Sequence, residues 1–172
     1  MPDEFARAFR FRVTLNQSPA GPGTGGGTGP VLGGGAFQEC TGLDLEMDVA
    51  EYVEGGRNDG VVQRAGRVKL ARITLRRGML HPAGGGGGGG AGGGVDGALW
   101  RWFADVVDGV RPLRRYDGTI QLLDGRHQPV GGWKFVRGLP AKLVGPALNG
   151  RTGEIAIEEL QIAHEGLRLE VP

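Results

Sequence analysis

The chain has little of what most classes of function require. Its 172 residues contain one cysteine, Cys40, which excludes an intramolecular disulfide framework and fits folding in a reducing cytosol. Its 20 lysines and arginines are balanced by 19 acids, whereas a nucleic-acid-binding surface needs a surplus of bases. No apolar run approaches the ~20 residues that cross a bilayer, and the N-terminus has no apolar signal core. We therefore expect no specific nucleic-acid binding, no membrane span and no signal peptide.

Groups of residues with catalytic or metal-binding chemistry are equally scarce. His81, His127 and His164 each stand alone, without a second ligand at metal-binding spacing. Glu158 and Glu159 are adjacent in a predicted strand, so their side chains face opposite ways and cannot act as a catalytic pair. No GxSxG motif is present. We expect no catalytic residue, no metal, no cofactor and no enzymatic activity.

Glycine, in contrast, is abundant, with 36 residues concentrated in two blocks. The blocks predict flexible insertions at residues 18–35 and 83–94 of a single domain that spans residues 1–172. Gly21, Gly23 and Gly26 formally match GxGxxG, but prolines and further glycines follow instead of a helix. A nucleotide site is therefore not expected there.

Residues 37–77 predict two long strands joined by a glycine-punctuated loop. Apolar and polar residues alternate over 43–49, which is typical of a half-buried strand. Residues 68–77 are rich in β-branched side chains and predict the second strand. Residues 9–15 alternate in the same way and predict the first strand of the chain.

These two halves carry opposite charge. Residues 37–54 hold six acids and no base, whereas residues 57–77 hold seven bases and one acid. One interpretation is cross-strand pairing within one copy, where each pair contributes little. The other is that the acidic and basic surfaces meet between copies of the chain. The spacing alone leaves both open.

A change of apolar period predicts one helix, from Asp96 to Asp108. Asp96 could cap its start, Gly109 favours its end, and Pro112 prevents its continuation. Trp100 lies off the apolar face. The expected core anchors are Leu99, Trp102, Phe103 and Val106.

The last third of the chain predicts further strands. Residues 114–123 and 130–136 form a predicted hairpin. Two prolines favour an edge or a crossover for residues 138–146. A final strand is expected from Gly153, with a bulge near residues 158–159, where the apolar parity changes.

Six short runs together resemble the tube protein family of contractile-tail phages and phage-tail-like contractile injection systems. The runs are FQECTGL (37–43), EYVEGG (51–56), ITLRRG (73–78), LWRWF (99–103), GPALN (145–149) and EIAIEELQIAHEGL (154–167). The resemblance covers nearly the whole chain apart from the glycine blocks, which depart from the family pattern.

The resemblance implies a mainly β fold, as two packed antiparallel sheets or a distorted β-barrel with one flanking helix. It implies a structural subunit of an inner tube, made in the cytoplasm and built into a phage virion or a phage-tail-like particle that can be released. Six copies are expected to close a ring, and rings to stack into a hollow tube that is driven through a target envelope. The implied partners are other copies, a sheath protein, baseplate and cap proteins, and effector cargo in the lumen.

By the same resemblance, the segment from Glu51 to Arg64 lies against neighbouring copies. The subunit-interface candidates are Glu51, Tyr52, Val53, Glu54, Arg57, Val61, Val62 and Arg64. Two alternatives stay open, a baseplate-proximal tube initiator and a stand-alone β-barrel module that binds a ligand. The second would need a concave aromatic cluster, whereas the tryptophans are divided between the predicted helix and a strand.

Overall fold

The structure, a computed structural model, describes residues 10–19, 29–32, 37–56, 60–79, 96–151 and 153–171. The glycine-rich insertion predicted at 83–94 lies outside the described residues, as does most of the one at 18–35. The elements are β1 (Phe11–Gln17), β2 (Phe37–Thr41), β3 (Leu45–Tyr52), β4 (Val62–Leu70), β5 (Ile73–Gly78), α1 (Ala98–Val107), β6 (Tyr116–Leu123), β7 (Pro129–Val144), β8 (Ile157–Ala163) and β9 (Gly166–Glu170).

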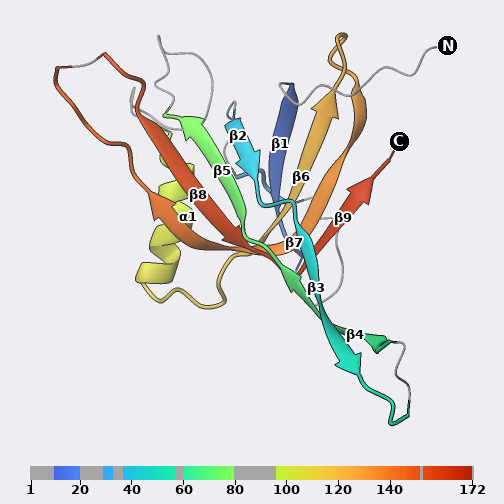
Figure 1. Ribbon diagram of the computed structural model, residues 1–172. Helices are drawn as coiled ribbons and strands as arrows, with labels where there is room; N and C mark the ends of the chain where they lie inside the picture. The colour runs from blue at the N-terminus through green and yellow to red at the C-terminus, as the bar shows by residue number, and fades with distance from the viewer. Residues whose placement is uncertain are drawn as a thin grey trace.

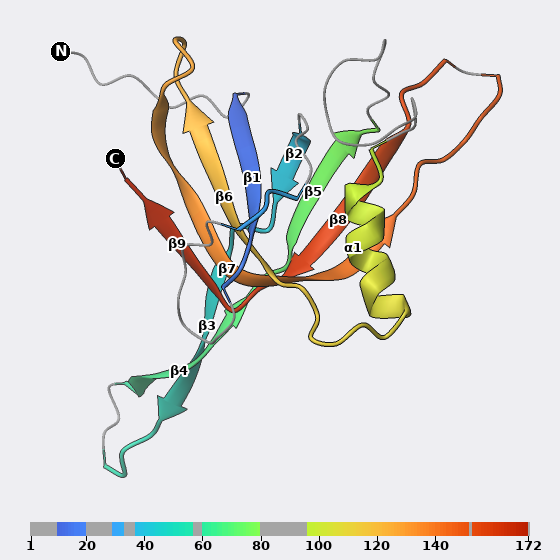
Figure 2. The same cartoon turned by 180° about the vertical axis from the view of Figure 1, so that it is seen from behind.

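Two antiparallel sheets and one helix make up this part of the chain, so the fold is mainly β, as expected. The larger sheet has seven strands in the order β1-β6-β7-β8-β5-β2, with β9 also paired to β7. It is strongly curled but does not close into a barrel (Figure 1). The smaller sheet is the hairpin β3-β4, which projects away from the body in both views (Figures 1 and 2). We call this hairpin the arm.

The two long strands expected over residues 37–77 are each broken once. Strand β2 ends at Thr41 and β3 begins at Leu45, while β4 ends at Leu70 and β5 begins at Ile73. The breaks lie side by side, because β2 pairs with β5 in the body and β3 pairs with β4 in the arm. One pair of chain segments therefore serves both sheets, and the breaks form the root of the arm.

Strand β7 agrees with the edge or crossover predicted for residues 138–146. It runs for 16 residues, pairs with β6 and β9 through its first half, and pairs with β8 through its second half. Pro140 lies opposite Ile162 in the second half, where β8 is the only strand that pairs with β7 among the described residues. The register also shifts between Pro140 and Lys142, and a sheet edge or a bulge accepts a residue without an N–H group.

Strand β8 differs from the prediction. It begins at Ile157, and its register with β5 continues without a shift, so the bulge expected near residues 158–159 is absent from this pairing. The parity changes because Glu158 occupies a core position in line with Leu160 and Ile162, all three fully buried. A charged residue at a core position gives the appearance of a register change in the sequence.

The core lies on the inner side of the curled sheet. Residues Leu15, Ile73, Leu75, Leu99, Trp102, Tyr116, Ile120, Phe135, Leu160, Ile162 and Leu167 form it. Helix α1 packs beside β7 and β8 (Figure 2). Its Trp102 meets Tyr116 edge to face, with ring centroids 4.7 Å apart, and donates a hydrogen bond from Nε1 to the Arg114 carbonyl oxygen at 2.9 Å.

Candidate assembly interface

The direction of the arm is set at its root. Gly42 has φ +84°, a backbone conformation that residues with a Cβ rarely adopt, and a Cβ there would collide with the carbonyl oxygen of Arg72. His164 reaches the same root from the body, with Nε2 3.0 Å from the Ala71 carbonyl oxygen and Nδ1 3.1 Å from that of Gly166. The buried histidine has a structural role, as expected for a lone histidine. Close backbone packing and a core side chain therefore hold the arm on the body.

One face of the arm is apolar and uncovered. The register places Leu45, Met47 and Val49 of β3 opposite Leu70, Val68 and Ala65 of β4, so these six side chains share one face, which we call the apolar stripe. Leu45 is 60% exposed and Val49 is 54% exposed. Among the described residues, the half-buried strand predicted over 43–49 is wrong from Leu45 onward, because they supply no cover for this stripe, whereas Leu43 packs against the core.

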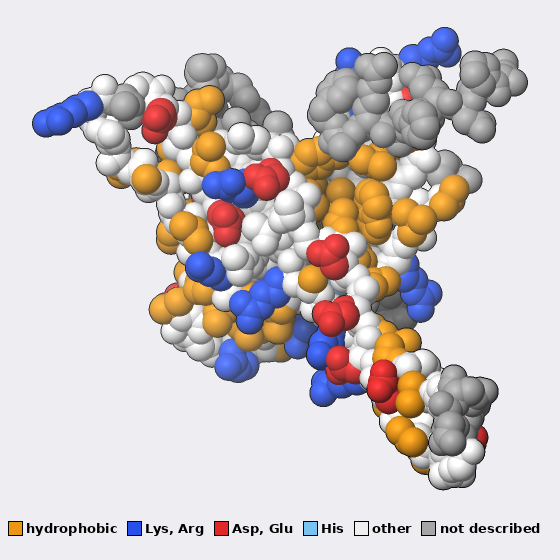
Figure 3. Space-filling view, in the orientation of Figure 1, with side chains coloured by type: hydrophobic (Ala, Val, Ile, Leu, Met, Phe, Trp, Pro, Cys, Tyr) orange, Lys and Arg blue, Asp and Glu red, His pale blue; other side chains and the backbone are white. Residues whose placement is uncertain are grey.

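The opposite face of the arm is charged. Glu46 lies opposite Lys69, and Lys69 Nζ contacts Asp48 Oδ1 at 2.6 Å. Nearer the tip, the Arg64 guanidinium lies 4.4 Å from the centre of the Tyr52 ring. Acidic side chains follow β3 along the arm, with apolar side chains beside them (Figure 3). The arm is thus an amphipathic two-stranded ribbon.

Both interpretations of the charge segregation keep some support. Within one copy, Arg76 pairs with Glu39 at 3.1 Å and with Glu159 at 3.5 Å, and Lys69 pairs with Asp48. These pairs are at least partly exposed and contribute little individually. Glu46 makes no ion pair with another described residue. Some of the acidic charge of the arm therefore remains available to another molecule.

The predicted interface residues lie at the outer end of the arm. Glu51 and Tyr52 end β3, Val53 and Glu54 follow it, Val61 precedes β4, and Val62 and Arg64 lie in β4. Arg57 lies outside the described residues. The glycine-punctuated loop expected between the two strands is shorter than the segment from Glu51 to Arg64, because strand pairing continues to Tyr52 and Val62. The described members of the set share one projecting feature, whereas the predicted set omitted the apolar stripe nearer the root.

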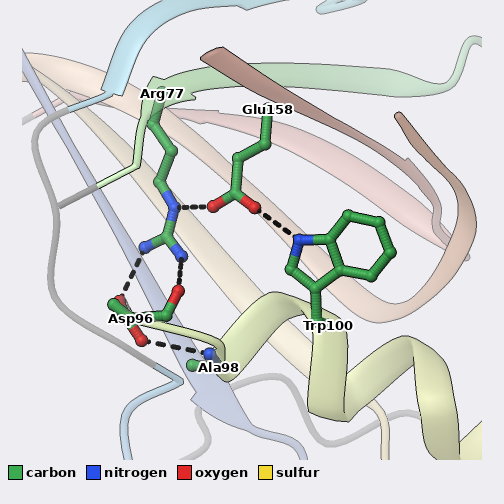
Figure 4. A network of polar contacts seen from close by, with 5 residues as sticks. All are labelled: Arg77, Asp96, Ala98, Trp100 and Glu158. Carbon is green, nitrogen blue, oxygen red and sulfur yellow. Dashed lines mark hydrogen bonds and ion pairs between the residues drawn. The ribbon is translucent and has the colours of Figure 1, made fainter. Parts of the chain in front are cut away.

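A buried polar network holds helix α1 on the sheet (Figure 4). Arg77 Nε donates to Glu158 Oε1 at 2.6 Å, and Arg77 Nη1 donates to Asp96 Oδ2 at 3.0 Å. Trp100 Nε1 donates to the second oxygen of Glu158 at 2.9 Å. Asp96 Oδ1 also accepts a hydrogen bond from the Ala98 N–H at 3.0 Å. The N-cap residue is Gly97, so Asp96 contacts the first helical residue from one position before the cap that was expected of it. The network joins β5, β8 and α1 and satisfies the charges that it buries.

The predicted helix anchors divide into three kinds. Leu99 and Trp102 are buried, Phe103 is half-buried, and Val106 is exposed. Val106 therefore does not anchor the helix on the described residues, which cover the apolar face of α1 mainly at Leu99 and Trp102. Trp100 lies off that face, as expected, and its indole serves the polar network instead.

No group of three or more His, Cys, Asp or Glu side chains in the described part of the chain could hold a metal ion. Burial raises the pKa of the Cys40 thiol to about 11, so that the reactive thiolate is rare at neutral pH. No helix in the described ranges has the length and apolarity to cross a membrane.

Comparison with known families assigns the chain. The model of the T4-like virus tail tube protein gp19 family matches residues 7–168. The chain belongs to this tail tube family. Its members are structural proteins of the tube. A comparison with curated protein sequences found no match.

Solved structures share the fold of this tail tube protein. A chain of the anti-feeding prophage (AFP) baseplate, described as six-fold symmetrised, is 21% identical over 98% of this chain and 97% of that chain, with a TM-score of 0.71. A chain of the PVC sheath-tube complex in the extended state is 18% identical, covers 97% and 92%, and has a TM-score of 0.68. A chain of the PVC sheath/tube terminator is 18% identical, covers 98% and 99%, and has a TM-score of 0.69.

Proposed function

We propose that this tail tube subunit closes six-membered rings that stack into the hollow inner tube of a contractile particle, and that the arm makes contacts between copies. The observation that carries the proposal is the apolar stripe, which projects from the body without cover. Monomeric proteins rarely expose a contiguous apolar surface of this kind unless another molecule binds it. The six-fold symmetry described for the AFP baseplate supports the ring size.

The partners follow from the same assembly. Structures with this fold come from complexes described as a baseplate, a sheath-tube complex and a tube-terminating cap. We propose corresponding sheath, baseplate and cap partners for this chain, and effector cargo inside the tube. The subunit would be made in the cytoplasm and would then become part of a phage virion or a released phage-tail-like particle. Head-to-tail contacts that do not close on themselves produce stacks of this kind.

The experiment is electron microscopy of the purified full-length chain together with sedimentation velocity. Rings or stacked tubes are expected for the natural sequence. A concentration-independent monomer would overturn the proposal and would favour a stand-alone binding module.

A matched pair of substitutions tests the arm. Val53 at the tip is 69% exposed and Val107 at the end of the helix is 74% exposed, so neither is needed to fold the body. Val53→Asp is expected to weaken assembly at least about tenfold, because it would bury a charge at the contact. Val107→Asp is expected to leave assembly within about twofold of the natural chain. Equal effects of the two substitutions on assembly would show that the arm tip is not part of the interface.

A further inference from the structure

We propose that β3 of one copy adds alongside the free edge of β9 in a second copy, and that Glu46 of the arm then lies opposite Arg168. The inference rests on the proposed function and names the surface that accepts the arm. It comes from three features of the described residues, namely unpaired strand edges, matching faces and one unbalanced charge.

The first feature is the pair of free edges. Among described residues, β9 pairs only with β7, and β3 pairs only with β4. An unpaired edge exposes a row of N–H and C=O groups that another strand can complete. The arm diverges from β9 of its own copy in both views, so it does not lie along that edge itself (Figures 1 and 2). A second copy can supply the missing strand.

The second feature is the match between the faces of the two strands. On β9, Leu167 and Leu169 point to the core side of the sheet, opposite Phe135 and Trp133. Leu167 is buried, but Leu169 is 61% exposed, and apolar side chains gather openly over this region (Figure 3). If β3 continues the sheet, its apolar stripe extends this apolar surface on the same side. Each strand alternates with a period of two, so the other faces match as well.

The third feature is the charge on the far face. Arg168 lies directly opposite Lys134, and like charges in that position destabilise a sheet. Glu170 balances Lys134, with Oε1 3.7 Å from Nζ, while Arg168 makes no ion pair with another described residue. Glu46 on β3 is an acid that likewise makes no ion pair with another described residue. Pairing Glu46 with Arg168 would supply the missing counter-charge to both residues.

The other available edges fit less well. Strand β1 is partly covered, because Leu32 N–H donates to the Leu15 carbonyl oxygen and Asn16 forms a bridge with Val31. Strand β2 is short and carries the acid Glu39, which would repel the acids of β3. On the arm itself, β4 carries bases that would repel Arg168, so the acidic β3 is the matching edge.

A charge exchange tests the pairing. Glu46→Arg and Arg168→Glu are each expected to raise the protein concentration needed for assembly about fivefold, because an attraction becomes a repulsion. The double variant E46R/R168E restores the attraction and is expected to return to within about twofold of the natural chain. If the double variant needs a protein concentration for assembly that reflects the sum of the two single effects, the inference is overturned.

Cysteine crosslinking gives a second, independent result. Opposite side chains in paired strands have Cβ atoms close enough for a disulfide, in either strand direction. Under mild oxidation, a mixture of the Glu46→Cys and Arg168→Cys chains is expected to form a crosslinked dimer, whereas each chain alone forms none. Both changes in one chain should give a ladder of multimers, because the contact is head-to-tail.

The native Cys40 is half-buried, and burial raises the pKa of its thiol, so it provides little background. A mixture of Leu148→Cys with Arg168→Cys is the control, since Leu148 is highly exposed on the connection between β7 and β8. Assembled tubes without the E46C–R168C crosslink would reject this pairing and leave the tube function intact. Absence of any assembly by the natural chain would reject both.

Discussion

Removing the carboxylate of Glu158 is the most direct perturbation of the buried network. The side chains of Arg77 and Glu158 are 2% and 0% exposed, so water cannot replace either partner. Breaking a buried ion pair costs about 3–5 kcal/mol, because one charge stays buried without its counter-ion. Asp96 remains 3.0 Å from Arg77 after the change, which places Glu158→Ala near the lower end, at about 3 kcal/mol.

Thermal unfolding is the assay, followed by circular dichroism at a protein concentration below the assembly threshold. A loss of about 3 kcal/mol lowers the Tm by about 6–12 °C in a domain of this size. Tryptophan fluorescence provides a second probe, because Trp100 contacts Glu158 directly.

Two further variants serve as comparisons for Glu158→Ala. Replacing both charges in R77M/E158L is expected to cost less than about 1 kcal/mol, since similar apolar volume can fill the site without desolvating a charge. Glu159→Ala is the neighbouring control, on the partly exposed face of β8, and should cost at most about 1 kcal/mol. A loss of less than about 1 kcal/mol in E158A, or a double apolar variant as unstable as E158A, would show that burial of an unpaired Arg77 charge is not the cause of the destabilisation.

Three other outcomes follow from the root of the arm, the thiol and a turn. Gly42→Ala is expected to destabilise the fold by about 1–3 kcal/mol, because Gly42 has a positive φ and a Cβ there would collide with the Arg72 carbonyl oxygen. Urea unfolding measures this loss, and an unchanged midpoint would contradict it. Burial raises the pKa of Cys40 from 9.0 to about 11, so a thiol reagent at pH 8 should react about a hundredfold more slowly with folded than with unfolded protein. Hydrogen bonds, first from the Gln128 N–H, lower the pKa of Asp124, so its stabilisation is present at neutral pH and is lost as the pH falls below about 4. Asp124→Asn should therefore unfold with a weaker acid dependence, and an unaltered acid profile would exclude this contribution.

The alternation of residues predicted where strands occur better than it predicted what covers them. Residues 43–49 were expected to be half-buried, and the alternation does mark one apolar face on β3. Its cover is not among the described residues of this chain. A period-two pattern reports that a face is to be buried, but it cannot say whether the cover belongs to the same molecule.

Pro140 predicts an edge or a crossover, and beyond Gly138 the described part of β7 pairs only with β8. Another difference comes from a residue whose role depends on a tertiary partner. Glu158 suggested a shift of register, because a carboxylate at a core position is unusual until Arg77 is seen beside it. The resemblance to the tail tube family does not depend on these details, because it rests on six short runs distributed along the chain.

The length of β7 has a mechanical consequence. This strand is hydrogen-bonded to β6, β9 and β8 along its 16 residues, so a force applied along it loads three ladders in shear at the same time. The arm contains a single ladder that ends in a turn, so it can peel open one hydrogen bond after another. The same chain therefore combines a body that resists thrust with a compliant appendage that can adjust to whatever it touches.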